Sequence, residues 1–261
     1  YCTRGVLGDA HAAMTLRMVA SVPATALLVP AIAAGAAEEL SGLRAAALNV
    51  TRELNEACDE VVVLAGTPAA THISSIPAQG WGTWAPVGYV GVEGLAPNAT
   101  PTTDSRQVPV PIMVAAWLLN SVHSSHRRSY FICPTQGFGT DTAPGTRELN
   151  EALNRHGQIG LLVVADGSCC RGPKAPGSEV LGAIEHDAEL TDALTSVNTD
   201  WFTHADRNRD AAAFGSQGLG AWALAAEIAS GSGRNWHGEV RHLDDPYGVL
   251  YAVADWQPVV G

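Results

Sequence analysis

Two short apolar runs constrain the fold of this chain more than any other feature. The first is VVVLAG at residues 61–66, and the second is GLLVVADG at residues 160–167. A continuous valine and leucine run of this length is typical of a strand buried on both faces, as in a parallel sheet covered by helices. We therefore expect both runs to be interior strands of one sheet.

The same seven residues, TRELNEA, precede both runs, at 51–57 and again at 146–152. Each copy has the pattern of an amphipathic helix, with Leu54 or Leu149 toward a core and Arg, Glu and Asn toward water. The repeat indicates a helix-then-strand unit that is used twice. Chance convergence of common helix residues is the alternative, since only seven residues match and the helix-to-strand spacings differ.

Helix and strand patterns alternate along the rest of the chain. This alternation predicts an α/β fold, a single domain with a mostly parallel or mixed central sheet and helices on both faces. We expect that domain at 14–261, after an unstructured leader at 1–13, with long loops at 66–111 and 166–179. The other expected elements are strands at 16–22, 130–133 and 248–256, and helices at 31–57 with a break near Gly42, 112–121, 185–195 and 219–229.

Composition excludes several classes of protein. Hydrophobic residues make up 46% of the 261 and charged residues 16%, which is typical of a globular domain. A net charge of −11 argues against a nucleic-acid partner, because phosphate binding needs clustered Lys and Arg. No uninterrupted apolar run predicts a membrane span, although the segment from Met14 loosely resembles a secretory signal.

The number and spacing of the five cysteines indicate the cellular compartment of the protein. Their odd number, without zinc-like spacing, favours a reduced, cytoplasmic protein. Adjacent Cys169 and Cys170 form a poor disulfide pair, because neighbouring residues rarely reach the required geometry. We expect one of these two thiols to be the most accessible in the native protein.

Polar residues follow the expected strands, where parallel sheets bind ligands. Asp166 ends the second apolar run, and a carboxylate in that position can orient a ligand or cap a turn. Cys169 is a candidate nucleophile if Arg171 or a helix end lowers its thiol pKa. We expect catalytic roles at Asp166, Ser168 and Cys169, and a metal ligand at His72. We expect ligand contacts at Ala24, Thr67, Trp81 and Trp84. Three more polar residues near the C-terminus, Asp244, Asp245 and Tyr247, are also expected at the strand ends.

Several segments together resemble a known family. They are ASVPATALLVP, the strand ending in GTP, WGTWAPVGYVGVEG, VVADGSCCRGPKAPG and the closing DDPYGVLYAVADW. This combination is similar to the class III extradiol dioxygenase superfamily of the LigB type, and more closely to its alanine-rich actinobacterial branch. The resemblance implies a non-haem Fe(II) that is held by two histidines and one glutamate and cleaves catechol-type rings with O2. Such a ligand set leaves open positions for catecholate and O2.

The resemblance also places the functional residues of the family on this chain. The iron histidines correspond to the segment after the first strand and to the end of the next strand, and the glutamate corresponds to a position about four residues before Trp222. The acid/base histidine corresponds to the residue after a Gly-x-Ser sequence. At these four places the chain has Pro23-Ala24-Thr25, Gly66-Thr67 with His72 five residues later, Gln217-Gly218, and Gly167-Ser168-Cys169.

Three functions are compatible with the sequence. The first is an Fe(II)-dependent oxidoreductase with His72, Asp166 and His242 as ligands. The second is a metal-free relative that binds a small aromatic or anionic molecule in the same pocket. The third is an interaction subunit that uses Trp81 and Trp84 as a contact surface. Each of these functions is compatible with a homo-oligomer.

Overall fold

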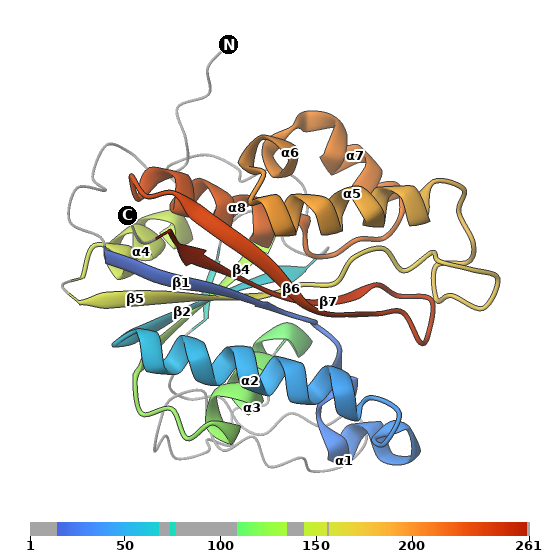
Figure 1. Cartoon of the computed structure of the whole chain (residues 1–261), viewed down its shortest axis with the longest axis horizontal. Coiled ribbons are helices and arrows are strands. Elements are labelled where there is room, and N and C mark those ends of the chain that lie inside the picture. Colours follow the sequence, from blue (N-terminus) through green and yellow to red (C-terminus); the bar gives the residue numbers. More distant parts are fainter. Residues whose placement is uncertain (1–14, 68–73, 77–108, 135–143, 156, 260–261) are drawn as a thin grey trace.

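Seven strands form one mixed sheet in the described part of this computed structural model, and helices cover both of its faces (Figure 1). The structure describes residues 15–67, 74–76, 109–134, 144–155 and 157–259. The strands are β1 (Thr15–Val22), β2 (Glu60–Thr67), β3 (Ser74–Ile76), β4 (Arg127–Pro134), β5 (Gln158–Val164), β6 (Trp236–Asp244) and β7 (Tyr251–Pro258). The α-helices are α1 (Pro30–Ala33), α2 (Ser41–Ala57), α3 (Val110–Ser121), α4 (Pro144–Leu153), α5 (Ala183–Ser196), α6 (Thr199–Thr203), α7 (Ala205–Ala213) and α8 (Leu219–Gly231), and η2 (Ala26–Leu28) and η3 (Ala34–Ala36) are 3-10 turns.

The strand order is β3-β4-β2-β5-β1-β7-β6. The four strands β4, β2, β5 and β1 run parallel, whereas β3, β7 and β6 pair antiparallel at the two sides. Both apolar runs are interior strands, β2 and β5, and they are direct neighbours. The expected α/β class with a mixed sheet and helices on both faces is therefore confirmed.

The two apolar runs are uninterrupted because both faces of these strands are covered. Along β2, Val61 and Val63 belong to the core that includes α2 and α3, while Val62 and Leu64 belong to the core that includes α8. All four valine and leucine side chains are fully buried. Figure 1 shows the same division, with α2 and α3 on one side of the sheet and α4 to α8 on the other.

The repeated TRELNEA segment forms the end of α2 and most of α4, and each helix leads into a central strand. Leu54 and Leu149 are both fully buried, as the pattern predicts. The two copies nevertheless belong to different cores, because Leu54 packs on the α2 face and Leu149 on the α8 face. The same local sequence thus covers opposite faces of the sheet.

The break in the first helical region lies earlier than we expect from the sequence. Gly42 is inside the first turn of α2, and the interruption covers residues 34–40. Arg44 explains how this break is tolerated, since its guanidinium donates to the carbonyl oxygens of Leu28 at 2.9 Å and Ala37 at 2.8 Å. The Arg44 side chain thus satisfies the carbonyl of Ala37 within the interruption and ties α2 to the segment before α1.

The sequence patterns do not predict strand β6. Its burial alternates along most of its length, and most of its side chains keep some exposure, because among the described strands it lies at the edge of the sheet beside β7. Charged residues such as Glu239 and Arg241 are typical of protected sheet edges. The final strand, expected over residues 248–256, begins only at Tyr251 as β7.

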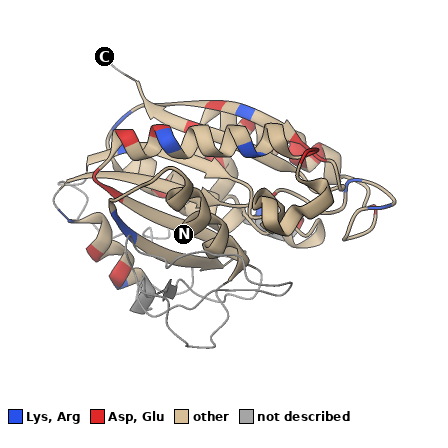
Figure 2. Ribbon diagram, turned by 90° about the horizontal axis from the view of Figure 1, so that it is seen from below, with Lys and Arg blue, Asp and Glu red and all other residues tan. Residues whose placement is uncertain are grey.

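Charges are distributed over the helix surfaces. Figure 2 shows acidic and basic residues interspersed along α2, and Arg52, Glu53 and Glu56 of this helix are exposed. Among the described residues, no helix combines the length and the apolar character that a membrane crossing requires.

Gly66 at the end of β2 marks a close contact between the sheet and the start of α8. A Cβ atom built there would overlap with the carbonyl oxygen of Gln217 and lie 3.0 Å from the Cα of Gly218. Both neighbours are backbone atoms, so they cannot move aside as a side-chain end can. The absence of a side chain at Gly66 lets the helix sit directly on the strand.

We expect Gly66→Ala to lower the free energy of unfolding by about 2 kcal/mol or more, since overpacking in a close contact costs about 1–3 kcal/mol. Urea unfolding followed by circular dichroism measures this change. Gly35→Ala is the matched control, because a Cβ at Gly35 meets nothing within 4 Å. Equal stability of the two variants would contradict the close contact.

Candidate functional site

Six strands bring their ends to one edge of the sheet. The parallel strands β1, β2, β4 and β5 all finish there, and the pairing of Asp244 with Tyr251 places the end of β6 and the start of β7 beside them. Parallel sheets generally bind ligands at this edge. Residues from the chain's beginning, middle and end therefore meet in one region.

Asp166 and the segment after β1 are in direct contact at this edge. The backbone N–H of Ala24 donates to Oδ1 of Asp166 at 2.8 Å, although the two residues are 142 positions apart. The hydroxyl of Ser216 donates to the backbone oxygen of Asp166 at 3.3 Å. The expected meeting of Ala24 and Asp166 is thus observed, but Ala24 contributes through its backbone. Thr67 lies at the same edge, paired in register with Pro134.

Tyr251 and Thr25 complete the surroundings of this carboxyl group, and we call Thr25, Asp166 and Tyr251 the Asp166 site. Burial raises the pKa of Asp166 to about 7, and the hydrogen bond from Ala24 acts in the opposite direction. Burial also raises the pKa of Tyr251 to about 12; a hydrogen bond with Thr25 lowers it, and the charge of Asp166 raises it. Near neutral pH the site therefore combines a carboxyl group that can change its protonation state with a phenol that stays protonated.

Acidic residues flank the Asp166 site. Tyr247 donates from its hydroxyl to Oε2 of Glu39 at 3.0 Å, which links the turn between β6 and β7 to the segment before α2. Partial burial raises the pKa of Tyr247, and the hydrogen bond to Glu39 and the charges of Glu39 and Asp244 raise it further. The site thus lies in a region of negative charge.

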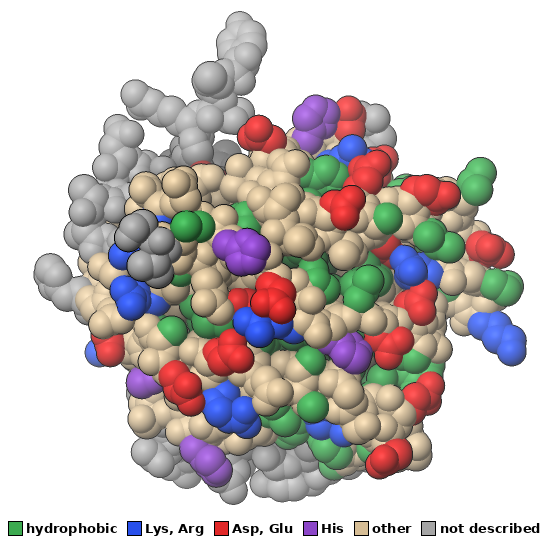
Figure 3. All heavy atoms as spheres, viewed as in Figure 1, with side chains coloured by type: hydrophobic (Ala, Val, Ile, Leu, Met, Phe, Trp, Pro, Cys, Tyr) green, Lys and Arg blue, Asp and Glu red, His purple; other side chains and the backbone are tan. Residues whose placement is uncertain are grey.

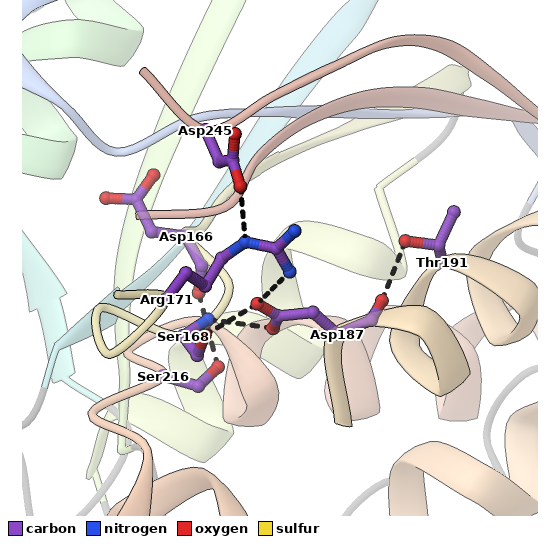
Figure 4. Close-up of polar contacts among 7 residues, drawn as sticks. All are labelled: Asp166, Ser168, Arg171, Asp187, Thr191, Ser216 and Asp245. Atoms are coloured by element: carbon purple, nitrogen blue, oxygen red, sulfur yellow. Dashed lines mark hydrogen bonds and ion pairs between the residues drawn. The ribbon is translucent and has the colours of Figure 1, made fainter. Parts of the chain in front are cut away.

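A second polar cluster fixes the loop that carries Asp166 (Figure 4). Asp187 of α5 is almost fully buried, and its carboxylate accepts from the Ser168 N–H at 3.0 Å and from the Ser168 hydroxyl at 2.5 Å. Arg171 donates to Asp187 at 2.9 Å and to Asp245 at 2.8 Å. We call Ser168, Arg171, Asp187 and Asp245 the loop clamp. In Figure 4 the side chain of Asp166 points away from this cluster.

The loop clamp changes the interpretation of Ser168. Its side chain is fully buried, and its hydroxyl is bound to a carboxylate and not to a histidine. A buried hydroxyl in such a contact holds the loop in place, so this geometry does not support the expected catalytic role. Cys169 is partly exposed, whereas Cys170 is buried, and both thiols are free.

The sequence patterns did not identify Asp187 as a candidate. Its position could have indicated a buried charge, because Asp187 falls on the apolar face of α5 with Ala183 and Leu190. A charged residue at a core-facing helical position is unusual unless a partner is buried with it. Arg171, the partner, comes from an irregular loop whose position no periodicity indicates.

The iron site that the resemblance implies does not fit the described residues. Gly66 has no room for a side chain, and a Cβ on Gly218 would overlap with Ala165 and lie 2.7 Å from the Trp222 ring. Two of the positions that the resemblance assigns to iron ligands are therefore closed, Gly66 by backbone atoms and Gly218 by the side chains of Ala165 and Trp222. Within the described ranges, no group of three or more His, Cys, Asp or Glu could hold a metal ion.

His242, which is also expected as an iron ligand, contacts other residues. The His242 ring packs against α2 near Gly42, and its Nε2 lies 3.9 Å from a carboxylate oxygen of Asp244. His72, Trp81 and Trp84 lie outside the described residues. The roles assigned to these three residues stay predictions.

Comparison with known proteins adds no further constraint. No protein-family model and no curated protein sequence matches this chain.

We expect Asp187→Ala to lower the free energy of unfolding by about 3–5 kcal/mol, the range for breaking a buried ion pair on one side. The substitution leaves the guanidinium of Arg171 and the Ser168 hydroxyl without this acceptor. Denaturant unfolding provides the measurement. Asp192→Ala, at an exposed position on the same helix, is the control, and similar losses in both variants would contradict the role of the clamp.

His186 is a second unusual group on α5. Its ring lies between Trp201 and Phe214, with ring centroids 5.7 Å and 5.2 Å away. Neither ring nitrogen has a hydrogen-bond partner among the described residues. Burial lowers the pKa of His186, although the Asp187 and Asp210 carboxylates act in the opposite direction.

This lowered pKa predicts a pH-dependent stability. The unfolded chain binds a proton at His186 as the pH falls through about 6.5, whereas the folded protein binds it only at lower pH. His186 therefore contributes a loss of stability below about pH 6.5, whereas Asp166, whose folded-state pKa is raised to about 7, contributes a gain over the same range. Between pH 7.5 and 5.5 we expect the free energy of unfolding, measured in urea, to change less favourably for the wild type than for His186→Phe. His237→Gln, at an exposed position, should behave like the wild type.

Proposed function

We propose that this protein binds a small neutral phenol at the Asp166 site, as a LigB-type relative of the class III extradiol dioxygenases in which the iron site is closed. The observation that carries this proposal is that Asp166 lies near enough to Tyr251, at the carboxyl edge of the sheet, for its charge to raise the pKa of the phenol. One group can accept a hydrogen bond from a ligand hydroxyl, and the other can donate one to it. No iron takes part in this proposed activity.

The protonation states support a hydroxyl-bearing ligand. Above about pH 7 Asp166 is ionised, and an O–H···O⁻ bond from a phenol is stronger than a bond between neutral groups. Tyr251 stays protonated because its pKa is about 12, so it donates to the phenol oxygen. The Thr25 hydroxyl, which hydrogen-bonds Tyr251, orients this donor.

The surrounding charge favours a neutral ligand over an anion. Glu39 and Asp244 are close to Tyr247 at this edge, and their carboxylates repel a ligand carboxylate. The nearby guanidinium of Arg171 is engaged with Asp187 and Asp245. An aromatic acid therefore lacks a counter-charge from these groups, whereas a phenol does not need one.

The interaction-subunit alternative has less support on the face shown in Figure 3. Hydrophobic side chains there are scattered among charged ones and do not form one continuous patch. Monomeric proteins commonly expose single apolar residues in this way. Trp81 and Trp84, on which this alternative depends, lie outside the described residues.

We expect Asp166→Asn to weaken phenol or catechol binding by about 10- to 100-fold at pH 8, because a hydrogen bond to a charged group contributes about 1.5–3 kcal/mol. Asparagine keeps an oxygen for the Ala24 N–H, so the fold is preserved. Wild-type affinity should be higher at pH 8 than at pH 6, as Asp166 ionises between them. Calorimetric titration at both pH values measures these changes.

Three comparisons make the result decisive. Asp192→Asn, exposed on α5, should bind as the wild type does. Benzoate should bind more weakly than phenol, and equal or tighter binding of benzoate would contradict the proposed ligand class. The titrations are repeated anaerobically with Fe(II), and phenol binding that requires Fe(II) would instead support the ring-cleaving oxidoreductase.

A further inference from the structure

The thiols of Cys169 and Cys170 are held together on one side of their loop. The Cys170 thiol donates to the Gly177 carbonyl oxygen at 3.6 Å. Burial raises the pKa of this thiol, and the neighbouring Cys169 thiol raises it further. A Cβ built on Gly177 would lie 2.6 Å from Cys170 Sγ and 2.9 Å from Cys169 Sγ. The two sulfur atoms therefore converge on one point.

Glycines keep the space around this pair clear. Any side chain at Gly177 would collide with both sulfur atoms, and a Cβ on Gly215 would lie 2.5 Å from Cys169 Sγ. Gly215 also has a positive φ of 65°, which disfavours other residues. The convergence of the thiols thus depends on two glycines that come from different segments.

The backbone around the pair is fixed from several directions. The Cys169 N–H donates to the Phe214 carbonyl oxygen at 3.0 Å, and the Cys169 carbonyl oxygen accepts from the Gly177 N–H at 2.9 Å. The Cys170 carbonyl oxygen accepts from the Val180 N–H at 3.2 Å. Arg171, the next residue, belongs to the loop clamp. Such a rigid support holds two donor atoms in place before a ligand arrives.

We propose that Cys169 and Cys170 form a dithiol site that chelates a thiophilic trivalent metalloid, with trivalent arsenic as its simplest case. Chelation requires two sulfur atoms on one side at a short separation, which the structure provides. It does not require a bond between the sulfurs, so it avoids the difficult geometry of a disulfide between neighbours. The Cys169 thiol, which is partly exposed, forms the first As–S bond. The buried Cys170 thiol then forms the second and closes the chelate.

The chelation step involves no oxidation or reduction. With phenylarsine oxide, two S–H bonds and the arsenic–oxygen bond break, and two As–S bonds form. Both thiol protons leave on the oxide oxygen as one molecule of water, and arsenic stays trivalent. The step therefore needs no oxidant, reductant or further reactant.

Phenylarsine oxide is the probe, applied to the folded full chain in a Cys2→Ser background, because Cys2 lies outside the described residues. Native mass spectrometry should show one phenylarsenic group per chain. This adduct should survive excess 2-mercaptoethanol and be removed by 1,2-ethanedithiol, since only a dithiol competes with a chelate. Cys169→Ser and Cys170→Ser should each weaken retention at least tenfold, whereas Cys58→Ala, at a buried site, should not.

Gly177→Ala tests the geometry while it leaves both thiols in place. Its added methyl group forces the sulfur atoms apart, so retention of the adduct should fall at least tenfold. The site is refuted if the wild-type adduct forms only after unfolding, is removed by 2-mercaptoethanol, or persists in either serine variant. Near-ultraviolet circular dichroism confirms that each variant is folded before the comparison.

Discussion

The buried carboxylate of Asp187 supports the arrangement of the whole candidate region. It accepts three hydrogen bonds from the loop after β5, two from Ser168 and one from Arg171, and Arg171 extends the contact to Asp245. Removing a charge from water is costly unless it is paired and fully hydrogen-bonded, so this carboxylate holds its partners firmly. The loop on which Asp166 and the two adjacent cysteines lie is fixed to α5 and to the turn between β6 and β7.

On the other face of the sheet, close packing excludes a binding site instead of supporting one. The start of α8 rests on the ends of β2 and β5 because Gly66 and Gly218 have no side chains. The same contact that stabilises this layer removes the room in which a LigB-type iron site would need its ligands. The chemistry proposed for this edge therefore belongs to Asp166 and Tyr251, on the α2 face.

Much of the fold could be predicted from the sequence, whereas little of the site could. The uninterrupted run in β2 and the spacing of Leu54 identified a buried strand and its helix, because burial on both faces or on one stripe leaves a periodic pattern. Strand β6 lacked such a pattern because it lies at an edge. Asp166 was identified from its place at a strand end, but its proximity to Tyr251 was not.

The sequence by itself determined many of the strands and helices, and that β2 and β5 lie inside a sheet. Those properties depend on side chains within a few residues of one another, so local periodicity records them. Only the tertiary structure decided that Ala24 contacts Asp166, that Arg171 pairs with Asp187, and that glycines close the positions expected for iron ligands. Each of these contacts joins separate segments of the chain, and its strength depends on burial and distance, which no local pattern contains.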